Sequence, residues 1–157
     1  MYTAFDSLSA TQQSDYLSLK MIHSAAGLDR YLEQQGYAST ESDQHRDYSK
    51  TVWPLVRAHP ISKRRALYFG NQITIGVVGW DDQRAINFVH ELTEHACQQS
   101  HQYRHHWRVG DAVLWDNRRV LHAGTNYDTQ HSRRLMHRTT WRETQPIRMI
   151  GENDNPM

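Results

Sequence analysis

Residues 110–122 read GDAVLWDNRRVLH, and residues 133–138 read RRLMHR. The first stretch opens with a Gly-Asp turn, continues as the short apolar run 112–115 and is broken by an Asp-Asn pair. This succession is typical of a short β-strand bounded by turns. A single histidine, His122, follows the break, so the sequence predicts a strand that leads to a well-placed imidazole in the C-terminal part of the chain.

Two arginines share one face of the second stretch. If residues 133–141 form a strand, Arg134 and Arg138 point to the same side, because positions i, i+2 and i+4 of a strand share a face. A neutral imidazole is a common metal ligand, and a guanidinium fork binds a carboxylate. Together, His122 and the two arginines indicate a metal beside an anionic cosubstrate.

These motifs resemble the C-terminal signature of the taurine/2,4-dichlorophenoxyacetate (TauD/TfdA) family of Fe(II)- and 2-oxoglutarate-dependent dioxygenases. Members of that family carry W-D-N-R-x-x-x-H and then R-R-x-M-x-R, and both motifs stand here in this order, at 115–122 and 133–138. The resemblance continues upstream through residues 56–60, 65–68 and 92–96, so it covers nearly the whole chain. It is nearer to the herbicide-type members than to the taurine enzyme.

The resemblance implies roles for single residues and two small molecules, Fe(II) and 2-oxoglutarate. His122 would be the distal histidine of the iron triad, and Arg134 would hold the far carboxylate of 2-oxoglutarate. Arg138 and Trp115 would contact a small acidic substrate, a carboxylate or sulfonate, although a strand tryptophan is more often a core residue. The gap before the arginine pair is slightly longer than in the family pattern, which leaves Arg133 as an alternative to Arg134.

In the family, an H-x-D pair that supplies the other two iron ligands precedes this segment. The chain is therefore expected to be the C-terminal part of a dioxygenase domain, truncated at its N-terminal side. One alternative lies within the sequence: of its 11 histidines, only His45 begins an H-x-D motif, with Asp47. Residues 39–49 are polar and lack the alternation of a strand, which favours a solvated loop over a ligand pair.

Composition sets further limits. A length of 157 residues suits one domain, and 38% hydrophobic residues is polar for an enzyme that closes a barrel around its site. The sequence has neither a membrane-spanning apolar run nor an N-terminal signal, and its basic residues are too dispersed for a nucleic-acid footprint. The single cysteine, Cys97, excludes an intramolecular disulfide, so we expect a buried thiol and a cytoplasmic protein.

Local patterns predict the elements. A capping box from Ser9 to Gln12 predicts a helix that runs to about Ser24, and a cap at Asp81 or Asp82 predicts a second helix to about Gln98. The expected apolar face of this second helix comprises Ile86, Val89, Leu92, Thr93 and Ala96. Residues 25–51 are predicted to be a long loop with a short helix at 28–34. Strands are predicted at 55–58, 66–69, 73–78, 103–107, 112–115, 120–123 and 134–142.

Together these elements predict a mainly β protein with flanking helices, a double-stranded β-helix (jelly-roll) over residues 1–145 followed by a tail at 146–157. The expected activity is hydroxylation of a small acidic substrate, coupled to decarboxylation of 2-oxoglutarate to succinate, with the truncated chain itself inactive. An alternative from another class is a non-catalytic jelly-roll remnant that binds a partner or self-associates as a homo-oligomer through open strand edges.

Overall fold

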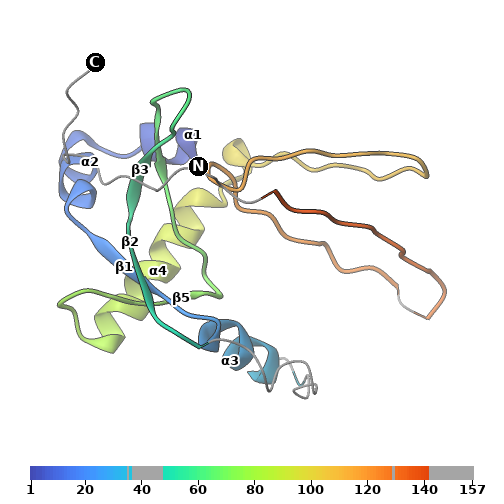
Figure 1. Cartoon of the computed structure of the whole chain (residues 1–157), viewed down its shortest axis with the longest axis horizontal. Coiled ribbons are helices and arrows are strands. Elements are labelled where there is room, and N and C mark those ends of the chain that lie inside the picture. Colours follow the sequence, from blue (N-terminus) through green and yellow to red (C-terminus); the bar gives the residue numbers. More distant parts are fainter. Residues whose placement is uncertain (35, 37–47, 129, 142–157) are drawn as a thin grey trace.

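The computed structural model describes residues 1–34, 36, 48–128 and 130–141. The helices and strands occupy the first two thirds of the chain (Figure 1). In chain order the elements are α1 (Tyr2–Asp6), α2 (Ala10–Leu17), β1 (Lys20–His23), α3 (Ala26–Gln34), β2 (Thr51–Pro54), β3 (Val56–Ala58), β4 (Arg65–Leu67), β5 (Thr74–Val77), α4 (Asp82–Ala96) and the short 3-10 helix η2 (Gln99–His101).

We call the part of the chain from Met1 to η2, as far as it is described, the body. A three-stranded antiparallel sheet, in the order β2-β1-β5, forms the centre of the body. In the register, Met21 of β1 lies opposite Trp53 of β2 and Val77 of β5. Alternate residues of β1 point inward, and Met21 is fully buried. The sequence predicted that the helix beginning after Ser9 would run to about Ser24. That prediction was wrong in its second half, because α2 ends at Leu17 and Lys20–His23 form β1.

The second sheet is the hairpin of β3 and β4, in which Val56 pairs with Leu67. The predicted strands at 55–58 and 66–69 correspond to this hairpin, and the predicted strand at 73–78 corresponds to β5. The short helix expected inside the long loop is α3. Leu55 joins the two sheets, since its amide donates to the carbonyl of Leu19 and its own carbonyl accepts from Tyr68.

Helix α4 packs against β5 and completes the core. Asp81 caps it by accepting a hydrogen bond from the amide of Arg84, as the sequence predicts. Its inner face differs in part from the expected one, because Ile86 is 59% exposed and Phe88 is buried instead. Cys97 directly follows the helix and is exposed, so the expectation of a buried thiol was wrong. The core consists of Ala4, Phe5, Leu8, Met21, Leu55, Val56, Leu67, Phe69, Val77, Ala85, Phe88, Val89, Leu92 and Ala96.

The C-terminal part leaves the body as two long excursions that run out and back, yellow to red in Figure 1. We call residues 102–115 the first arm and residues 120–141 the second arm; the turn 116–119 joins them. As far as the structure describes them, to residue 141, the four strands predicted here are not formed, which corrects the sequence-based expectation. A strand requires backbone partners, and the described backbone hydrogen bonds within the arms are turn bonds, such as Asp111 N–H to Arg108 C=O and Ser132 N–H to Asp128 C=O.

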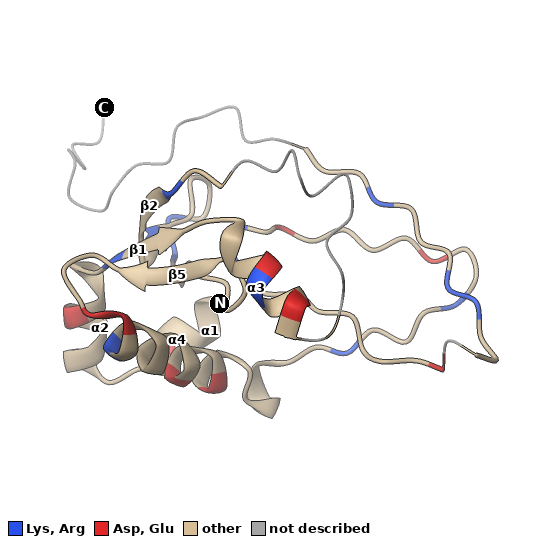
Figure 2. Ribbon diagram, turned by 90° about the horizontal axis from the view of Figure 1, so that it is seen from below, with Lys and Arg blue, Asp and Glu red and all other residues tan. Residues whose placement is uncertain are grey.

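The described residues thus form two small antiparallel sheets with flanking helices, and not a closed jelly-roll. Figure 2 shows Lys and Arg spread over the body and both arms instead of gathered on one element. Within the described ranges, no helix is both long and apolar enough to cross a membrane.

Candidate functional site

The turn between the two arms places Trp115 beside His122. Their ring centroids lie 5.0 Å apart with the planes tilted by 52°. The indole Nε1–H of Trp115 donates to Oδ1 of Asn117 at 2.8 Å, which fixes the ring at the start of the turn. The amide of Arg119 closes the turn by donating to the carbonyl of Asp116. His122 itself is exposed, so its imidazole is accessible to a ligand.

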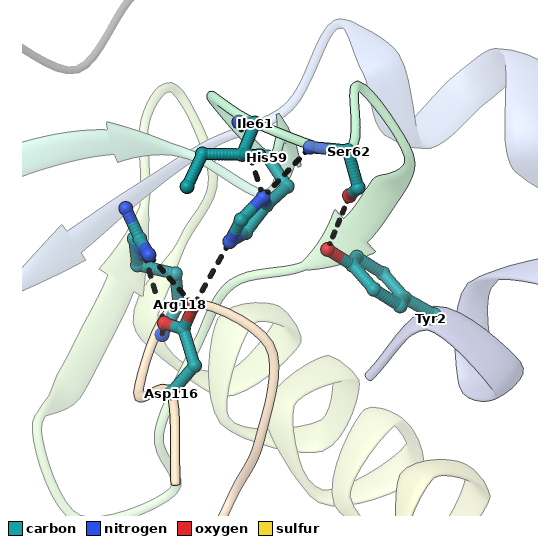
Figure 3. A network of polar contacts seen from close by, with 6 residues as sticks. All are labelled: Tyr2, His59, Ile61, Ser62, Asp116 and Arg118. Carbon is teal, nitrogen blue, oxygen red and sulfur yellow. Dashed lines mark hydrogen bonds and ion pairs between the residues drawn. The ribbon is translucent and has the colours of Figure 1, made fainter.

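Asp116, in the turn 116–119, accepts more hydrogen bonds than any carboxylate described in the arms. Its Oδ1 accepts from Nε and from the backbone N–H of Arg118, at 2.8 and 2.9 Å. Its Oδ2 accepts from Nη2 of Arg118 at 2.7 Å and from Nε2 of His59 at 2.9 Å (Figure 3). The hydrogen bonds from Arg118, followed by that from His59, hold the pKa of Asp116 far below its usual range.

His59 approaches this carboxylate from the body. It lies in the turn after β3 and is 9% exposed. Its Nδ1 accepts hydrogen bonds from the backbone amides of Ile61 and Ser62, at 3.3 and 3.1 Å. Because both of these groups are donors, Nδ1 carries a lone pair, and the ring proton sits on Nε2. His59 is not among the site residues predicted from the sequence, because its partner Asp116 lies 57 residues away and no local pattern identifies it.

The structure brings Arg134 to the segment that carries His122. A Cβ atom built on Gly124, two residues after His122, would lie 3.3 Å from Nη1 of Arg134 and 3.8 Å from Nη2. The guanidinium of Arg134 therefore lies directly over the glycine backbone. Arg133 and Arg138 are exposed. Of the predicted site residues, Trp115 and His122 belong to the segment 115–124, and Arg134 contacts Gly124 of this segment. No described contact joins Arg138 to them.

The described residues offer an incomplete set of metal ligands. No group of three His, Cys, Asp or Glu side chains among them could hold a metal ion. Fe(II) in this type of site needs two histidines and a carboxylate on one face, and His122 supplies a single imidazole. The alternative pair His45 and Asp47 lies outside the described residues. The described part of the site therefore fits the binding of a carboxylate by Arg134, but not a complete iron site.

A second titratable group is buried outside this site. His23 is 5% exposed, and its Nε2 is a buried nitrogen without a hydrogen-bond partner. Its ring stacks on Tyr68 at a centroid distance of 5.7 Å, and the guanidinium of Arg57 lies 4.2 Å from the centroid of the same tyrosine. Burial lowers the pKa of His23 to about 4. The imidazole is therefore neutral at neutral pH.

Comparison with known proteins agrees with the sequence motifs. The family described as "Taurine catabolism dioxygenase TauD, TfdA family" matches residues 1–140, and the chain belongs to this family. The match spans the body, the first arm, the turn 116–119 and the second arm to residue 140, and so includes His122.

Two relatives show which members of the family the chain resembles. The chain is 37% identical over 140 residues to the alpha-ketoglutarate-dependent 2,4-dichlorophenoxyacetate dioxygenase of Cupriavidus pinatubonensis, a match covering 89% of this chain and 47% of that protein. It is 33% identical over 125 residues to the alpha-ketoglutarate-dependent sulfonate dioxygenase of Saccharomyces cerevisiae, covering 76% of this chain and 28% of that one. Alpha-ketoglutarate is another name for 2-oxoglutarate. The herbicide-type resemblance expected from the motifs is thus confirmed.

A solved structure shares the fold of part of the chain. The crystal structure of AAD-2 in complex with Mn(II) and N-oxalylglycine superposes with a TM-score of 0.64 and 27% identity, covering 76% of this chain and 46% of that one. This chain spans about half the length of AAD-2 and of the Cupriavidus enzyme.

Proposed function

We propose that this chain forms part of an Fe(II)- and 2-oxoglutarate-dependent dioxygenase that hydroxylates a small acidic substrate. The observation that carries the proposal is the position of Arg134, whose guanidinium lies over Gly124, two residues from His122. A cation fork next to an accessible imidazole suits a cosubstrate that has a carboxylate at one end and a metal chelator at the other. We propose that residues 1–145 are the C-terminal portion of a jelly-roll domain, in which the arms would be paired strands; the tail expected at 146–157 lies outside the described residues.

Each predicted residue has a role in this proposal. Arg134 binds the far carboxylate of 2-oxoglutarate through two parallel N–H groups, and His122 is one of three iron ligands. Arg138 binds the acidic group of the substrate, and Trp115 forms a wall of the substrate site. When bound, the iron supplies the oxidising chemistry that couples hydroxylation to the conversion of 2-oxoglutarate into succinate.

The names of the relatives support an acidic substrate. They act on 2,4-dichlorophenoxyacetate, a carboxylate, on a sulfonate and, in Pseudomonas putida, on a sulfate ester. All three substrates carry an anionic group, for which an exposed arginine such as Arg138 is a suitable partner. We propose a cytoplasmic location, which fits a cosubstrate of central metabolism.

The proposal is tested by cosubstrate binding to the 157-residue chain. N-oxalylglycine, the molecule bound by AAD-2, is titrated in the presence of Mn(II) by calorimetry. We expect Arg134→Ala to abolish the binding heat and Arg134→Lys to weaken it, because lysine lacks the bidentate fork. Arg133→Ala is the matched control and should bind as the wild type does. If Arg133→Ala removes binding while Arg134→Ala retains it, the assignment of the carboxylate-binding arginine is wrong.

Turnover is expected to require more than these residues. Because the described residues supply one iron ligand, we expect the purified chain to release no succinate above background with Fe(II), 2-oxoglutarate, ascorbate and oxygen. Should succinate appear, the His45→Ala and Asp47→Ala variants show whether that H-x-D motif is the source. Turnover that survives both substitutions but is lost in His122→Ala would contradict the proposed ligand set.

A second candidate function is self-association or partner binding through the arms. The observation that favours it is the exposure of large apolar side chains along both arms, among them Tyr103, Leu114, Leu135 and Trp141. Extended backbone without ladder partners is a template for strand pairing.

A further inference from the structure

We propose that His59 is a positioning residue for the segment that carries His122: by donating from Nε2 to Asp116, it fixes the turn 116–119 against the body and thereby sets the Trp115–His122 ring contact. The proposal rests on the proposed function only in naming His122 as an iron ligand. The positioning itself concerns side chains that the structure describes.

His59 is the donor in its hydrogen bond to Asp116. Two backbone amides, those of Ile61 and Ser62, donate to Nδ1 of His59 and leave its proton on Nε2. The ring is thus held by the body on one side and donates on the other. Tyr2 packs edge-on against this ring at a centroid distance of 6.2 Å, and its hydroxyl hydrogen-bonds to the side chain of Ser62 (Figure 3). His59 is therefore a fixed donor on the body.

Both carboxylate oxygens of Asp116 already accept two hydrogen bonds each. Four hydrogen bonds reach its two oxygens, three from Arg118 and one from His59. Arg118 is only two residues away, so its three hydrogen bonds to Asp116 lie within the turn. The bond from His59 attaches the turn. Two further described contacts join body and turn, both at Arg119: its carbonyl accepts from the Met1 amino group at 2.9 Å, and its guanidinium lies 5.9 Å from the centroid of the Tyr2 ring.

The turn 116–119 lies between Trp115 and His122 in the chain. Trp115 directly precedes Asp116, and its ring lies 5.0 Å from that of His122 on the other side of the turn. The two rings approach each other only while the turn keeps its shape. Without the bond from His59, the turn loses its side-chain attachment at Asp116 and keeps the described contacts at Arg119, so we expect the separation of Trp115 and His122 to vary. Ligand sites depend on such supporting hydrogen bonds for their geometry.

The test uses variants that separate the two functions of the His59 ring. In His59→Asn, the amide oxygen replaces Nδ1 and keeps the acceptor for Ile61 and Ser62, but the side chain is too short to reach Asp116. In His59→Gln, the longer amide places an N–H donor where Nε2 was. The chain also offers a matched control: Nε2 of His105 pairs with Asp111 at 3.1 Å within the first arm, so His105→Asn removes a similar pair that does not attach the turn to the body.

The readout is the ring resonance of His122 in ¹H–¹³C spectra of the full chain, without metal or 2-oxoglutarate, assigned by its loss in His122→Gln. The ring current of Trp115 displaces this resonance from the value of a free histidine. We expect His59→Asn to remove most of that displacement, and His59→Gln and His105→Asn to preserve it. A His122 resonance that stays at its wild-type position in a folded His59→Asn variant overturns the proposal.

Asp116→Ala removes the acceptor of the same link on the turn and decides the matter if His59→Asn fails to fold. Alanine removes both acceptor oxygens, so the bond from His59 is lost together with the three from Arg118. We expect the His122 displacement to fall, and the double variant with His59→Asn to change it no further. Additive changes would overturn the proposal. Because no cosubstrate is present, failure of N-oxalylglycine binding leaves this outcome unaffected.

Discussion

Arg134 covers the backbone of Gly124 so closely that a methyl group on this glycine would meet its guanidinium at 3.3 Å. Both residues belong to the second arm, whose chain runs out and back (Figure 1), and ten residues separate them in the sequence. A glycine at this position lets the arginine fork lie flat over the segment that follows His122. The size of residue 124 therefore controls where the fork lies.

Enlarging residue 124 is expected to weaken carboxylate binding. In Gly124→Ala the flexible guanidinium shifts by a few tenths of an ångström, and N-oxalylglycine should bind nearly as in the wild type. In Gly124→Leu the fork is displaced, and losing one charge-assisted hydrogen bond lowers affinity about tenfold or more. Calorimetry on both variants checks this. Equal affinities for the alanine and leucine variants would show that the fork does not depend on this contact.

The buried His23 makes stability depend on pH. Its pKa is about 4 in the folded chain, against 6.5 for an ordinary exposed histidine. The unfolded chain therefore binds the proton more tightly than the folded chain. The stabilisation is therefore full above about pH 6.5 and is lost as pH falls toward 4. Between pH 7 and pH 5 this group should cost about 2 kcal/mol of unfolding free energy.

His23→Phe isolates this effect, because phenylalanine keeps the stack on Tyr68 and does not titrate. Urea unfolding of both proteins at the two pH values gives the difference directly. We expect the wild type to lose about 2 kcal/mol more than the variant on acidification. The same pH dependence in both proteins would assign it to other groups.

Two aliphatic residues of α4 should respond very differently to truncation. Leu92 is 2% exposed, so Leu92→Ala should cost about 2–5 kcal/mol through lost burial and a cavity. Ile86, on the same helix, is 59% exposed, and Ile86→Ala should change stability by about 0.5 kcal/mol or less. Denaturant unfolding measures both. A large loss in Ile86→Ala would mean that another surface covers this residue in solution.

The arms should make the chain self-associate. Leu114 and Leu135 are 84% and 82% exposed on extended backbone, an arrangement that favours pairing with another copy. Sedimentation velocity should show species larger than a monomer that increase with concentration. The double substitution Leu114→Ser and Leu135→Ser should reduce them. A single monomer peak at all concentrations, for the wild type, would contradict the expectation.

Local chemistry predicted the body well. The capping box at Ser9, the Asp81 cap of α4 and the hairpin of β3 and β4 depend on neighbouring residues, and the structure contains all three. The error at β1 has a physical cause. Lys20–His23 carries no strong local preference, and its strand state is decided by pairing with β2 and β5, which lie far along the chain.

The arms show the opposite case. Residues such as 112–115 have the composition of a strand, but composition alone provides no partner for their backbone groups, and the described arms have none in a ladder. At the site, the family resemblance assigns roles to His122, Trp115, Arg134 and Arg138, and these roles stay predictions; the structure brings Trp115 beside His122 and Arg134 over Gly124. The resemblance did not predict that His59 would hold Asp116, because a buried histidine and an aspartate on distant turns leave no periodic signal.

The hydrogen bond between His59 and Asp116 also has a consequence for the order of folding. It closes a loop of 57 residues, and the entropy of closing a flexible loop of that length costs about 3.6 kcal/mol or more. A single hydrogen bond to a charged group returns about 1.5–3 kcal/mol, so this contact cannot nucleate the structure. It forms after the β3–β4 hairpin and α4 have already drawn the chain together, which makes the docking of the turn a late step on the folding pathway.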